Sequence, residues 1–576
     1  GGVPEDFHNS FVIGFDRPFD FWSVALDGIL RPGVTETEGD RAQAVLGFRT
    51  RRGEQVTARV ASSFISTEQA ILNLERETGG RGFDAVRDAG RDRWNAELGR
   101  IRVEGGTDDQ QRTFYSTLYR TLLFPRMFYE IDSTESIVHY SPYNGKVLPG
   151  RLFTDNGFWD TFRAAMPLIT LMYPELSSQI MEGLVNAYLE SGWLPEWASP
   201  GHRNCMIGSN SASLIADAYL KGIRGYDIDT LWKAIVKNTL GHGPVHSVGR
   251  YGAEYYNSLG YVPYDAGINE NVARTLEYAY ADWCLWKLAQ ELDRPQEEID
   301  LYGTRAKNYK NVFDAESSLM RGKNLDGTFQ SPFSPYKWGD AFTEGNSWHY
   351  TWSVFHDVAG LAELMGGDSE MAHMLDSVFV VPPLFDDSYY GFPIHEIREM
   401  QIMNMGNYAH GNQPVQHMIY LYNYTHEPWK TQMRVREVMD KLYNYTPDGY
   451  CGDEDNGQTS AWYVFSAMGF YPVTPGTGEY VLGSPLFTKA TVTLSNGNKL
   501  VISAPENSRD NFFVKEVRLN GDRLDLNYIT HNQLTAGGRL EFTMSSRPEK
   551  ERGTAISARP YSMSTATSAG QTEGAK

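Results

Sequence analysis

The spacing of the helical patterns constrains the fold of this chain more than any other feature of its sequence. Between residues 107 and 469, apolar residues at helical spacing and helix-breaking residues indicate about twelve helices. The links after the even-numbered helices are a few residues long, whereas those after the odd-numbered helices run to roughly fifteen to thirty-five residues. The expected starts lie near Thr107, Gly157, Glu175, Asn210, Asp229, Asn269, Gln296, Ser347, Asp368, Gln413, Glu427 and Thr459.

This alternation of short and long links predicts where the long loops lie. If consecutive helices run antiparallel, links of the same parity emerge at the same end of the helical layer. Every long loop would then gather on one face, which describes an (α/α)6 toroid of helical hairpins with one loop-rich mouth. An irregular helical domain with long insertions is the alternative.

The sequence on either side of the helical region is typical of β-structure, so we expect a multidomain α+β protein. At 576 residues the chain is too long for one ordinary core. The expected order is the C-terminal part of an N-terminal β-sandwich domain (1–67), linker helices and a short strand (68–106), the (α/α)6 catalytic domain (107–469), a small C-terminal β-domain (470–562) and a disordered tail (563–576).

The composition of the chain restricts the classes of ligand that we expect it to bind. The formal net charge of −20 argues against nucleic acid or an anionic membrane surface, because both attract basic patches. We expect a neutral or cationic ligand instead. Aromatic residues make up 13% of the chain and suit stacking on the apolar faces of sugar rings, although Tyr also fills ordinary cores. No apolar run reaches the roughly eighteen residues of a membrane span, so membrane insertion is not expected, and the oligomeric state is not predicted.

The sequence lacks the residue patterns that several other classes of protein require. Cys205, Cys284 and Cys451 lie far apart and in no metal-ligand spacing, which disfavours a disulfide framework or zinc ribbon and leaves one bridge open. No G-x-S-x-G elbow occurs. The motif H-E-x-x-H is absent too, because "HEIREM", which begins at His395, has no second histidine. A serine hydrolase of the elbow type and a zinc peptidase are therefore not expected.

One acid stands alone among aromatic residues. Glu344, in "TEGNSWHYTW", lies just ahead of an expected helix, where an acid can also serve as a cap or dipole partner. Burial would instead raise its pKa and keep it protonated, which a general acid needs. The aromatic residues around it are Trp338, Trp348, Tyr350 and Trp352.

A second loop crowds three acids together. The stretch "GDEDNGQ" contains Asp453, Glu454 and Asp455, which fit a solvated turn, a metal site or the base of a hydrolase. It lacks the ligand spacing and terminal Glu of an EF-hand.

Two further loops carry side chains that suit a sugar. "FWDTFR" offers Trp159 for stacking, and Asp160 with Arg163 three positions on, where a structural ion pair is the simpler interpretation. "GHRNC" offers residues 202–204, which would bind hydroxyls or lie exposed in a Gly/Pro loop. An isolated acid, an acid cluster on another loop and hydroxyl-binding side chains are together what an inverting glycosidase requires, with its two carboxyls roughly 6.5–9.5 Å apart.

Taken as a set, the loop motifs resemble a known family. They are "FWDTFR", "GWLPEW", "NCMIGSNSASLIADAY", "TEGNSWHYTW", "HEIREM", "GNQPVQHMIYLYNY" and "CGDEDNGQTSAWYVFSAMGFYPV". From about Phe7 to Ser562 the chain resembles glycoside hydrolase family 92, the calcium-dependent exo-acting α-mannosidases. The resemblance implies a β-sandwich, linker helices, an (α/α)6 catalytic domain and a small β-domain, in the order given above. It also implies that the chain is incomplete at its N-terminus relative to the family.

The resemblance implies a role for individual residues. Glu344 is the implied general acid and Asp455 the implied general base, with Asp453 as rival or helper and Glu454 pointing away. The implied hydroxyl contacts are Asp160, Arg203, Asn204, Cys205 and His395, with stacking by Trp159 or Trp348. Calcium is the implied cofactor. Its implied ligands are Glu396, Glu399, Asn412 and Gln413 together with the acid cluster, although the family more often has Glu where this chain has Gln413.

The function implied by the resemblance is an exo-acting, inverting α-mannosidase that removes terminal α-mannosyl residues from glycans outside the cytoplasm, in the periplasm or extracellular space. Two alternatives stay open at this point. One is a sugar-binding protein of the same fold without catalysis. The other is an (α/α)6 hydrolase or lyase that acts on another sugar.

Overall fold

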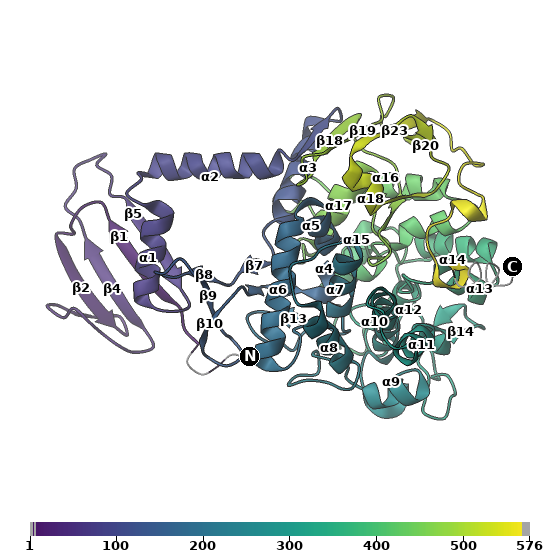
Figure 1. Cartoon of the computed structure of the whole chain (residues 1–576), viewed down its shortest axis with the longest axis horizontal. Coiled ribbons are helices and arrows are strands. Elements are labelled where there is room, and N and C mark those ends of the chain that lie inside the picture. The colour runs from purple at the N-terminus through teal and green to yellow at the C-terminus, as the bar shows by residue number, and fades with distance from the viewer. Residues whose placement is uncertain (1–3, 5–6, 567–576) are drawn as a thin grey trace.

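The computed structural model describes residue 4 and residues 7–566, which form both helices and sheets (Figure 1). Within these residues every sheet is open and none closes into a barrel. No helix of the described part is long and apolar enough to cross a bilayer. The mixed helix and strand content agrees with the expected α+β class, whereas the closed (α/α)6 arrangement stays a prediction.

The N-terminal strands form two small antiparallel sheets. In one, Ser10 lies opposite Ser63. Figure 1 shows both sheets at one side of the molecule, joined to the rest by helix α2. None of the α2 residues is buried, as expected of a polar helix that bridges two parts of a protein through solvent. The elements are β1 (Ser10–Phe15), β2 (Phe21–Leu26), β3 (Ile29–Arg31), β4 (Ala42–Gly47), β5 (Ala58–Ser63), α1 (Thr67–Thr78) and α2 (Phe83–Leu98).

A second connection anchors these sheets to the first long loop. Glu130 accepts hydrogen bonds from the Ser63 hydroxyl and the Phe64 backbone N–H, both at 2.9 Å. Phe64 and Phe128 pack together with ring centroids 4.7 Å apart. Short strands occupy this loop and later ones, namely β7 (Arg126–Met127), β8 (Glu130–Ile131), β9 (Ile137–Tyr140), β10 (Val147–Pro149), β11 (Phe153–Thr154), β12 (Asn156–Gly157), β13 (Trp197–Ala198), β14 (Phe313–Asp314) and β15 (Leu319–Met320).

The helical region begins with a capping box. The Thr107 hydroxyl accepts from the Gln110 N–H, and the Gln110 side chain accepts from the Thr107 N–H, so both free N–H groups are satisfied. The helices are α3 (Asp108–Thr121), α4 (Phe158–Thr161), α5 (Ala165–Met172), α6 (Pro174–Ser191), α7 (Ser211–Leu220), α8 (Ile228–Asn238), α9 (Ala253–Leu259), α10 (Asn271–Glu291), α11 (Gln296–Arg305), α12 (Ser347–Tyr350), α13 (Val358–Met365), α14 (Asp368–Val380), α15 (His395–Met403), α16 (Trp429–Leu442) and α17 (Gln458–Met468).

Several helices differ from the sequence-based expectation. The helix expected from Gly157 is divided into α4 and α5, and that from Ser347 into α12 and α13. The segment from Gln413 forms the 3-10 helices η3 (Gln413–Val415) and η4 (Met418–Tyr424). Every η4 residue is buried, so this segment has no polar face from whose spacing a 3-10 helix could be told from an α-helix. Helices α9 and α15 lie in expected loops because their seven and nine residues are too few for a clear period.

Hydrogen bonds tie long loops of this region to one another. The Asn412 side-chain N–H donates to the Glu344 carbonyl at 2.7 Å, across 68 positions of sequence. The Ser247 N–H donates to the Asn204 side-chain oxygen at 3.2 Å, across 43 positions. Loops that are distant in the chain therefore meet, and the acidic residues of interest lie on them.

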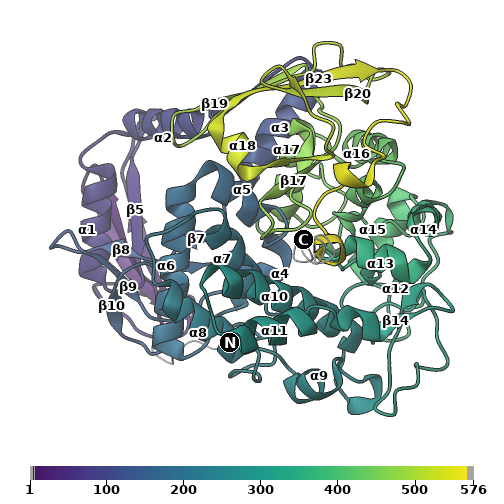
Figure 2. The ribbon, with the colours of Figure 1, turned by 45° about the vertical axis from the view of Figure 1, so that its right-hand side comes forward.

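The short strand β6 (Ile101–Glu104) joins the C-terminal sheet. The order of this six-stranded sheet is β21-β20-β23-β19-β18-β6, with Ile101 opposite Val492. Figure 2 shows the sheet laid across α3 and α17. One hydrophobic core continues from Trp462 in the helical region to Leu540 in the sheet. The remaining elements are β16 (Phe470–Tyr471), β17 (Glu479–Leu482), β18 (Lys489–Thr493), β19 (Lys499–Ser503), β20 (Phe513–Leu519), β21 (Asp522–Arg523), β22 (Tyr528–Thr530), α18 (His531–Ala536) and β23 (Gly538–Ser545).

The C-terminal tail requires a correction. Disorder was expected from residue 563, yet Met563 is 2% exposed, and the Ser564 hydroxyl donates to Asp357 at 2.7 Å. The low-complexity composition gave no sign that Met563 would be buried or that Ser564 would bond to Asp357. The rest of the expected tail, 567–576, lies outside the described residues.

Candidate active site

Glu344 occupies a strained position that its neighbours hold in place. Its φ of 46° lies in the left-handed region, which non-glycine residues rarely adopt. The Glu344 N–H donates to the Tyr390 hydroxyl at 3.2 Å, and the Glu344 carbonyl accepts from Asn412. Directly after it, the Asn346 side chain caps α12 by accepting from the His349 N–H. The backbone around this acid is therefore fixed from two loops.

The surroundings of the Glu344 carboxyl favour its protonated form. Burial and, to a smaller extent, the nearby acids Glu396 and Asp455 together raise its pKa to about 8. These are the conditions that keep a carboxylic acid ready to donate a proton.

Asp455 has the opposite protonation state at pH 7. Burial raises its pKa to about 6, whereas the hydrogen bond from the Gln413 side-chain amide to its Oδ2 favours the ionised form. Its φ of 51° is again left-handed. A half-buried carboxylate that is ionised at neutral pH and oriented by an amide suits the role of a base.

Glu454, between the other two acids, turns toward α17. Its Oε2 accepts from the Gly457 N–H at 2.8 Å, and its Oε1 accepts from the Ser460 hydroxyl at 2.5 Å. Burial raises the pKa of this carboxyl to about 7. Glu454 therefore stabilises the start of α17, in agreement with the expectation that it points away.

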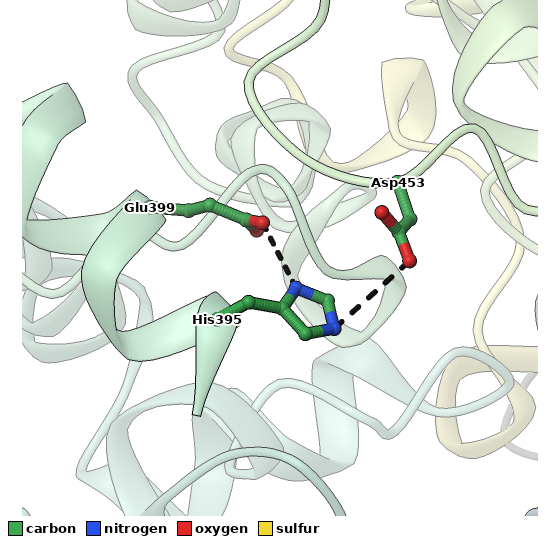
Figure 3. Close-up of side chains that lie close together, drawn as sticks. All are labelled: His395, Glu399 and Asp453. Atoms are coloured by element: carbon green, nitrogen blue, oxygen red, sulfur yellow. Dashed lines mark hydrogen bonds and ion pairs between the residues drawn. The ribbon is translucent and has the colours of Figure 1, made fainter. Parts of the chain in front are cut away.

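Asp453 lies at the exposed side of the acid cluster (Figure 3). Its side chain is 68% exposed, and its Oδ2 is 3.9 Å from the His395 Nε2. The His395 Nδ1 is 2.9 Å from the Glu399 Oε1. Figure 3 shows the imidazole between the two carboxylates. His395 thus joins α15 to the loop of residues 450–457.

The residues expected to bind calcium offer hard oxygen ligands. Glu396 Oε2 and Glu399 Oε2 are buried and have no hydrogen-bond partner among the described residues. Burial raises the pKa of both carboxyls. Ligand atoms of His395, Glu399 and Asp453 lie within 4.8 Å of one another. Unpartnered carboxylate oxygens fit a divalent cation such as calcium.

The two amides expected as ligands differ in their present contacts. The Asn412 oxygen accepts from the Gln413 N–H at 2.9 Å while its NH2 donates to Glu344. The Gln413 NH2 donates to Asp455. Both ends of the Asn412 amide are therefore in use. Its role as a metal ligand stays a prediction, as does that of Gln413.

Asp160 is buried close to Glu344 and Asp455. It is 1% exposed, and its Oδ2 has no hydrogen-bond partner among the described residues. Burial raises its pKa well above the usual range, and Asp455 and Glu344 raise it further. The expected ion pair with Arg163 is not the one that forms, because Arg163 pairs with Glu277 at 3.6 Å. Asp160 is thus a buried polar group close to both catalytic candidates.

Trp159 cannot stack on a sugar as expected. It is 1% exposed and belongs to the hydrophobic core, and the Arg163 guanidinium lies 5.1 Å from its ring centroid. The helical pattern of "FWDTFR" carried no sign of which aromatic faces the core. Trp348 is half-buried, and its role in stacking stays a prediction.

The remaining expected sugar contacts lie on one loop. Arg203 and Asn204 are exposed, and Cys205 is half-buried. Burial raises the pKa of the Cys205 thiol, with smaller effects from Arg203 and Asp160 in opposite directions. All three cysteines are free, so the single bridge left open by the sequence does not form.

Comparison with known proteins decides the family. Residues 69–546 match the family described as the glycosyl hydrolase family 92 catalytic domain. The chain belongs to glycosyl hydrolase family 92. This confirms the resemblance of its loop motifs.

Solved family 92 structures share the fold of this chain. The inverting mannosidase BT2199 from Bacteroides thetaiotaomicron VPI-5482 is 52% identical, with a TM-score of 0.92 over 98% of this chain and 76% of that protein. The α-mannosidase BT3965 from Bacteroides thetaiotaomicron is 32% identical, with a TM-score of 0.86 over 98% and 73%. BT3965 has also been solved with mannoimidazole.

A curated relative is more distant. An uncharacterized secreted glycosidase from Arthroderma benhamiae is 28% identical over an alignment of 546 positions, which covers 87% of this chain. The family 92 chain spans 62% of that relative's length.

Some residues of the family 92 site were missed by sequence reasoning. Tyr390 holds the Glu344 backbone, and Glu270 is among the charges that raise the Glu344 pKa. Glu270 also has a left-handed φ of 62°. Both lie in loops far from Glu344 in sequence. The aromatic pair in "YYGF" could have drawn attention to Tyr390, whereas no sequence signal pointed to Glu270.

Proposed function

We propose that the chain is an exo-acting, inverting α-mannosidase that hydrolyses terminal α-mannosyl residues of glycans. The observation that carries this proposal is the pair of carboxyl groups with opposite protonation states. The pKa of Glu344 is raised to about 8 and that of Asp455 to about 6, and each of these acids raises the pKa of the buried Asp160. A protonated acid and an ionised base that lie close enough to influence each other suit a single displacement with inversion.

In the proposed reaction, Glu344 donates its proton to the oxygen of the scissile glycosidic bond as that bond breaks. Asp455 accepts a proton from a water molecule, and the water oxygen attacks the anomeric carbon from the opposite face. The configuration inverts because bond formation and bond breaking occur on opposite sides of one carbon. Gln413 orients Asp455 through its hydrogen bond to Oδ2, and solvent restores both protonation states before the next turnover.

Mannose as the substrate is supported by the relatives. BT2199 and BT3965 are named as mannosidases and align with nearly the whole of this chain. Asp160, Asn204, Cys205 and His395 would bind the hydroxyls of the terminal sugar. Asp453 is the helper or rival of Asp455 at the water.

Calcium is the proposed cofactor. Glu396, Glu399 and Gln413 would hold it, with Asp453 and Asn412 beside them, because two buried carboxylate oxygens there have no hydrogen-bond partner among the described residues. A bound cation would supply positive charge for the sugar hydroxyls and for the developing negative charge of the reaction. His395, between Glu399 and Asp453, orients both carboxylates.

The finer architecture and the location are proposed with the function. The helices from α3 to α17 would form the (α/α)6 catalytic domain. The protein would act in the periplasm or outside the cell, which the secreted relative supports.

Turnover of an aryl α-mannoside tests the proposed function. The chain with added calcium should hydrolyse it, Asp455→Asn should lose about 10²–10⁴-fold in kcat/KM, and a chelator should abolish turnover reversibly. Asp510→Asn, on an exposed loop of the C-terminal β-region, is the matched control and should behave as the parent. Absence of turnover in the parent chain, or full activity of Asp455→Asn, would overturn the proposal.

A further inference from the structure

A line of buried hydrogen bonds joins the start of α5 to the loop of residues 450–457, called the acid loop below. At its first end, the backbone N–H groups of Ala164 and Ala165 donate to the Gln458 side-chain oxygen at 2.8 and 3.1 Å. The nitrogen of the Gln458 amide donates to the Gln416 side-chain oxygen at 2.9 Å. The line therefore passes from α5 to the residue that ends η3.

From Gln416 the line continues to the acid loop. The Gln416 side-chain nitrogen donates to the Thr459 hydroxyl at 3.2 Å, and this hydroxyl donates to the Asp453 carbonyl at 3.0 Å. Gln458, Gln416 and Thr459 are all 0% exposed. Because no bulk water reaches them, these groups depend on the partners that the fold supplies.

The direction of every bond in this line is determined at its first end. A backbone N–H can only donate, so the Gln458 amide turns its oxygen toward α5 and its nitrogen toward Gln416. The Gln416 oxygen accepts that bond, which leaves the Gln416 nitrogen to face Thr459. Because the Thr459 hydroxyl accepts from this nitrogen, its single proton is directed at the Asp453 carbonyl. The hydroxyl therefore has one orientation, and it holds the backbone of the acid loop.

The segments that this hydroxyl joins both position the proposed base. The Gln416 N–H donates to the carbonyl of Gln413 at 3.1 Å, and the Gln413 side-chain amide donates to Asp455. The Thr459 N–H donates to the Glu454 carbonyl at 3.2 Å. On the basis of the proposed function, we infer that Thr459 is a positioning residue. Its hydroxyl keeps the acid loop in register with Gln413, so that Asp455 can take a proton from the attacking water.

Three variants separate positioning from stability. Thr459→Val keeps the shape of the side chain and removes its hydroxyl, whereas Thr459→Ser keeps the hydroxyl. Thr431→Val is the matched control on α16, outside the proposed site. The Thr431 hydroxyl is also 0% exposed, accepts from the Asn423 side-chain amide at 3.0 Å and donates to the Ile419 carbonyl at 2.8 Å.

Turnover of dinitrophenyl α-mannoside is the first measurement. In Thr459→Val, kcat should fall about tenfold while KM changes less than about twofold, because a displaced base slows the reaction of bound substrate. Thr459→Ser and Thr431→Val should keep kcat within about twofold of the parent. Azide should restore part of the lost rate in Thr459→Val and have no such effect in the parent or in Thr431→Val. Its nitrogen bonds to the anomeric carbon as the bond to dinitrophenolate breaks, and no proton has to be removed.

A parent-like kcat in Thr459→Val, an equal loss in Thr431→Val, or no response of Thr459→Val to azide would overturn the positioning role. If Thr459→Val does not fold, Gln416→Met removes the amide that orients the hydroxyl and should give the same loss and the same response. Failure of the parent to hydrolyse the mannoside would instead overturn the proposed function. Hydrogen exchange followed by mass spectrometry still tests the positioning in that case. Exchange in residues 450–457 should be faster in Thr459→Val than in the parent and Thr431→Val, and equal exchange would refute the inference.

Discussion

At the residue scale, three acids of the site region have backbone conformations that residues other than glycine rarely adopt. Glu344, Asp455 and Glu270 all have φ between 46° and 62°. Such positions persist where surrounding contacts impose them, and Tyr390 and Asn412 do so for Glu344. The aromatic neighbours of Glu344 sufficed to predict a raised pKa. The contacts that hold it could not be predicted, because they join residues 46 and 68 positions apart.

Replacing Glu344 tests proton donation. In Glu344→Gln, kcat/KM for mannobiose should fall by about 10²–10⁴-fold, because the leaving oxygen then departs unprotonated. A dinitrophenyl α-mannoside, whose leaving group needs no proton, should lose far less. Glu363→Gln, an exposed acid on α13, should match the parent on both substrates. Losses of the same size on the two substrates would show that Glu344 is not the acid.

The pH profile follows from the same two groups. The proposed mechanism needs Glu344 protonated, so kcat/KM should fall as pH rises through a value at or below about 8. It also needs Asp455 ionised, so kcat/KM should fall as pH drops through a value at or below about 6. Calcium bound at the proposed site would move both limits downward, because a cation favours the ionised carboxylates. The alkaline limit should vanish in Glu344→Gln, and its persistence would assign it to another group.

At the element scale, helices of the site region stabilise one another across long sequence distances. Helix α5 has no capping side chain of its own, and the Gln458 oxygen accepts from the Ala164 and Ala165 N–H groups at 2.8 and 3.1 Å. Helix positions could be predicted from apolar spacing, but this cap could not, because it comes from α17. The short α15, which carries His395 and Glu399, was hidden for a related reason, since nine residues show little period.

Removing the Gln458 cap should destabilise the protein. Gln458 is 0% exposed, so Gln458→Leu leaves two buried N–H groups unpaired, at a cost of about 1–3 kcal/mol in the free energy of unfolding. Denaturant unfolding followed by fluorescence measures this change. The exposed Gln296→Leu on α11 should change it by less than about 0.5 kcal/mol. An unchanged midpoint in Gln458→Leu would contradict the capping role.

At the scale of the whole molecule, one core connects the helices to the C-terminal sheet, and a second core holds the last described residues of the chain. The sheet incorporates β6 from the linker, and Met563 packs in a second hydrophobic cluster of the helical region. The order of strand-rich and helical parts could be predicted from sequence patterns. The addition of β6 to this distant sheet could not be predicted. Ile101 and Val492 are far apart in sequence and pair only in the folded chain.

The anchoring of the C-terminal segment gives a stability prediction. Met563→Ala should cost about 2–5 kcal/mol, because it removes a buried side chain and leaves a cavity. Ile556→Ala, at a position that is 73% exposed, should cost less than about 0.5 kcal/mol. Thermal unfolding of both variants measures the difference. Equal melting temperatures would mean that residue 563 belongs to a disordered tail after all.

The stereochemistry of the released sugar tests the central claim most directly. Proton NMR during hydrolysis of an α-mannoside, recorded before mutarotation equilibrates the product, distinguishes the two anomers of mannose. Single displacement by Glu344 and Asp455 predicts that β-mannose appears first. If α-mannose appears first, the reaction retains configuration and the assignment of Asp455 as a base is wrong.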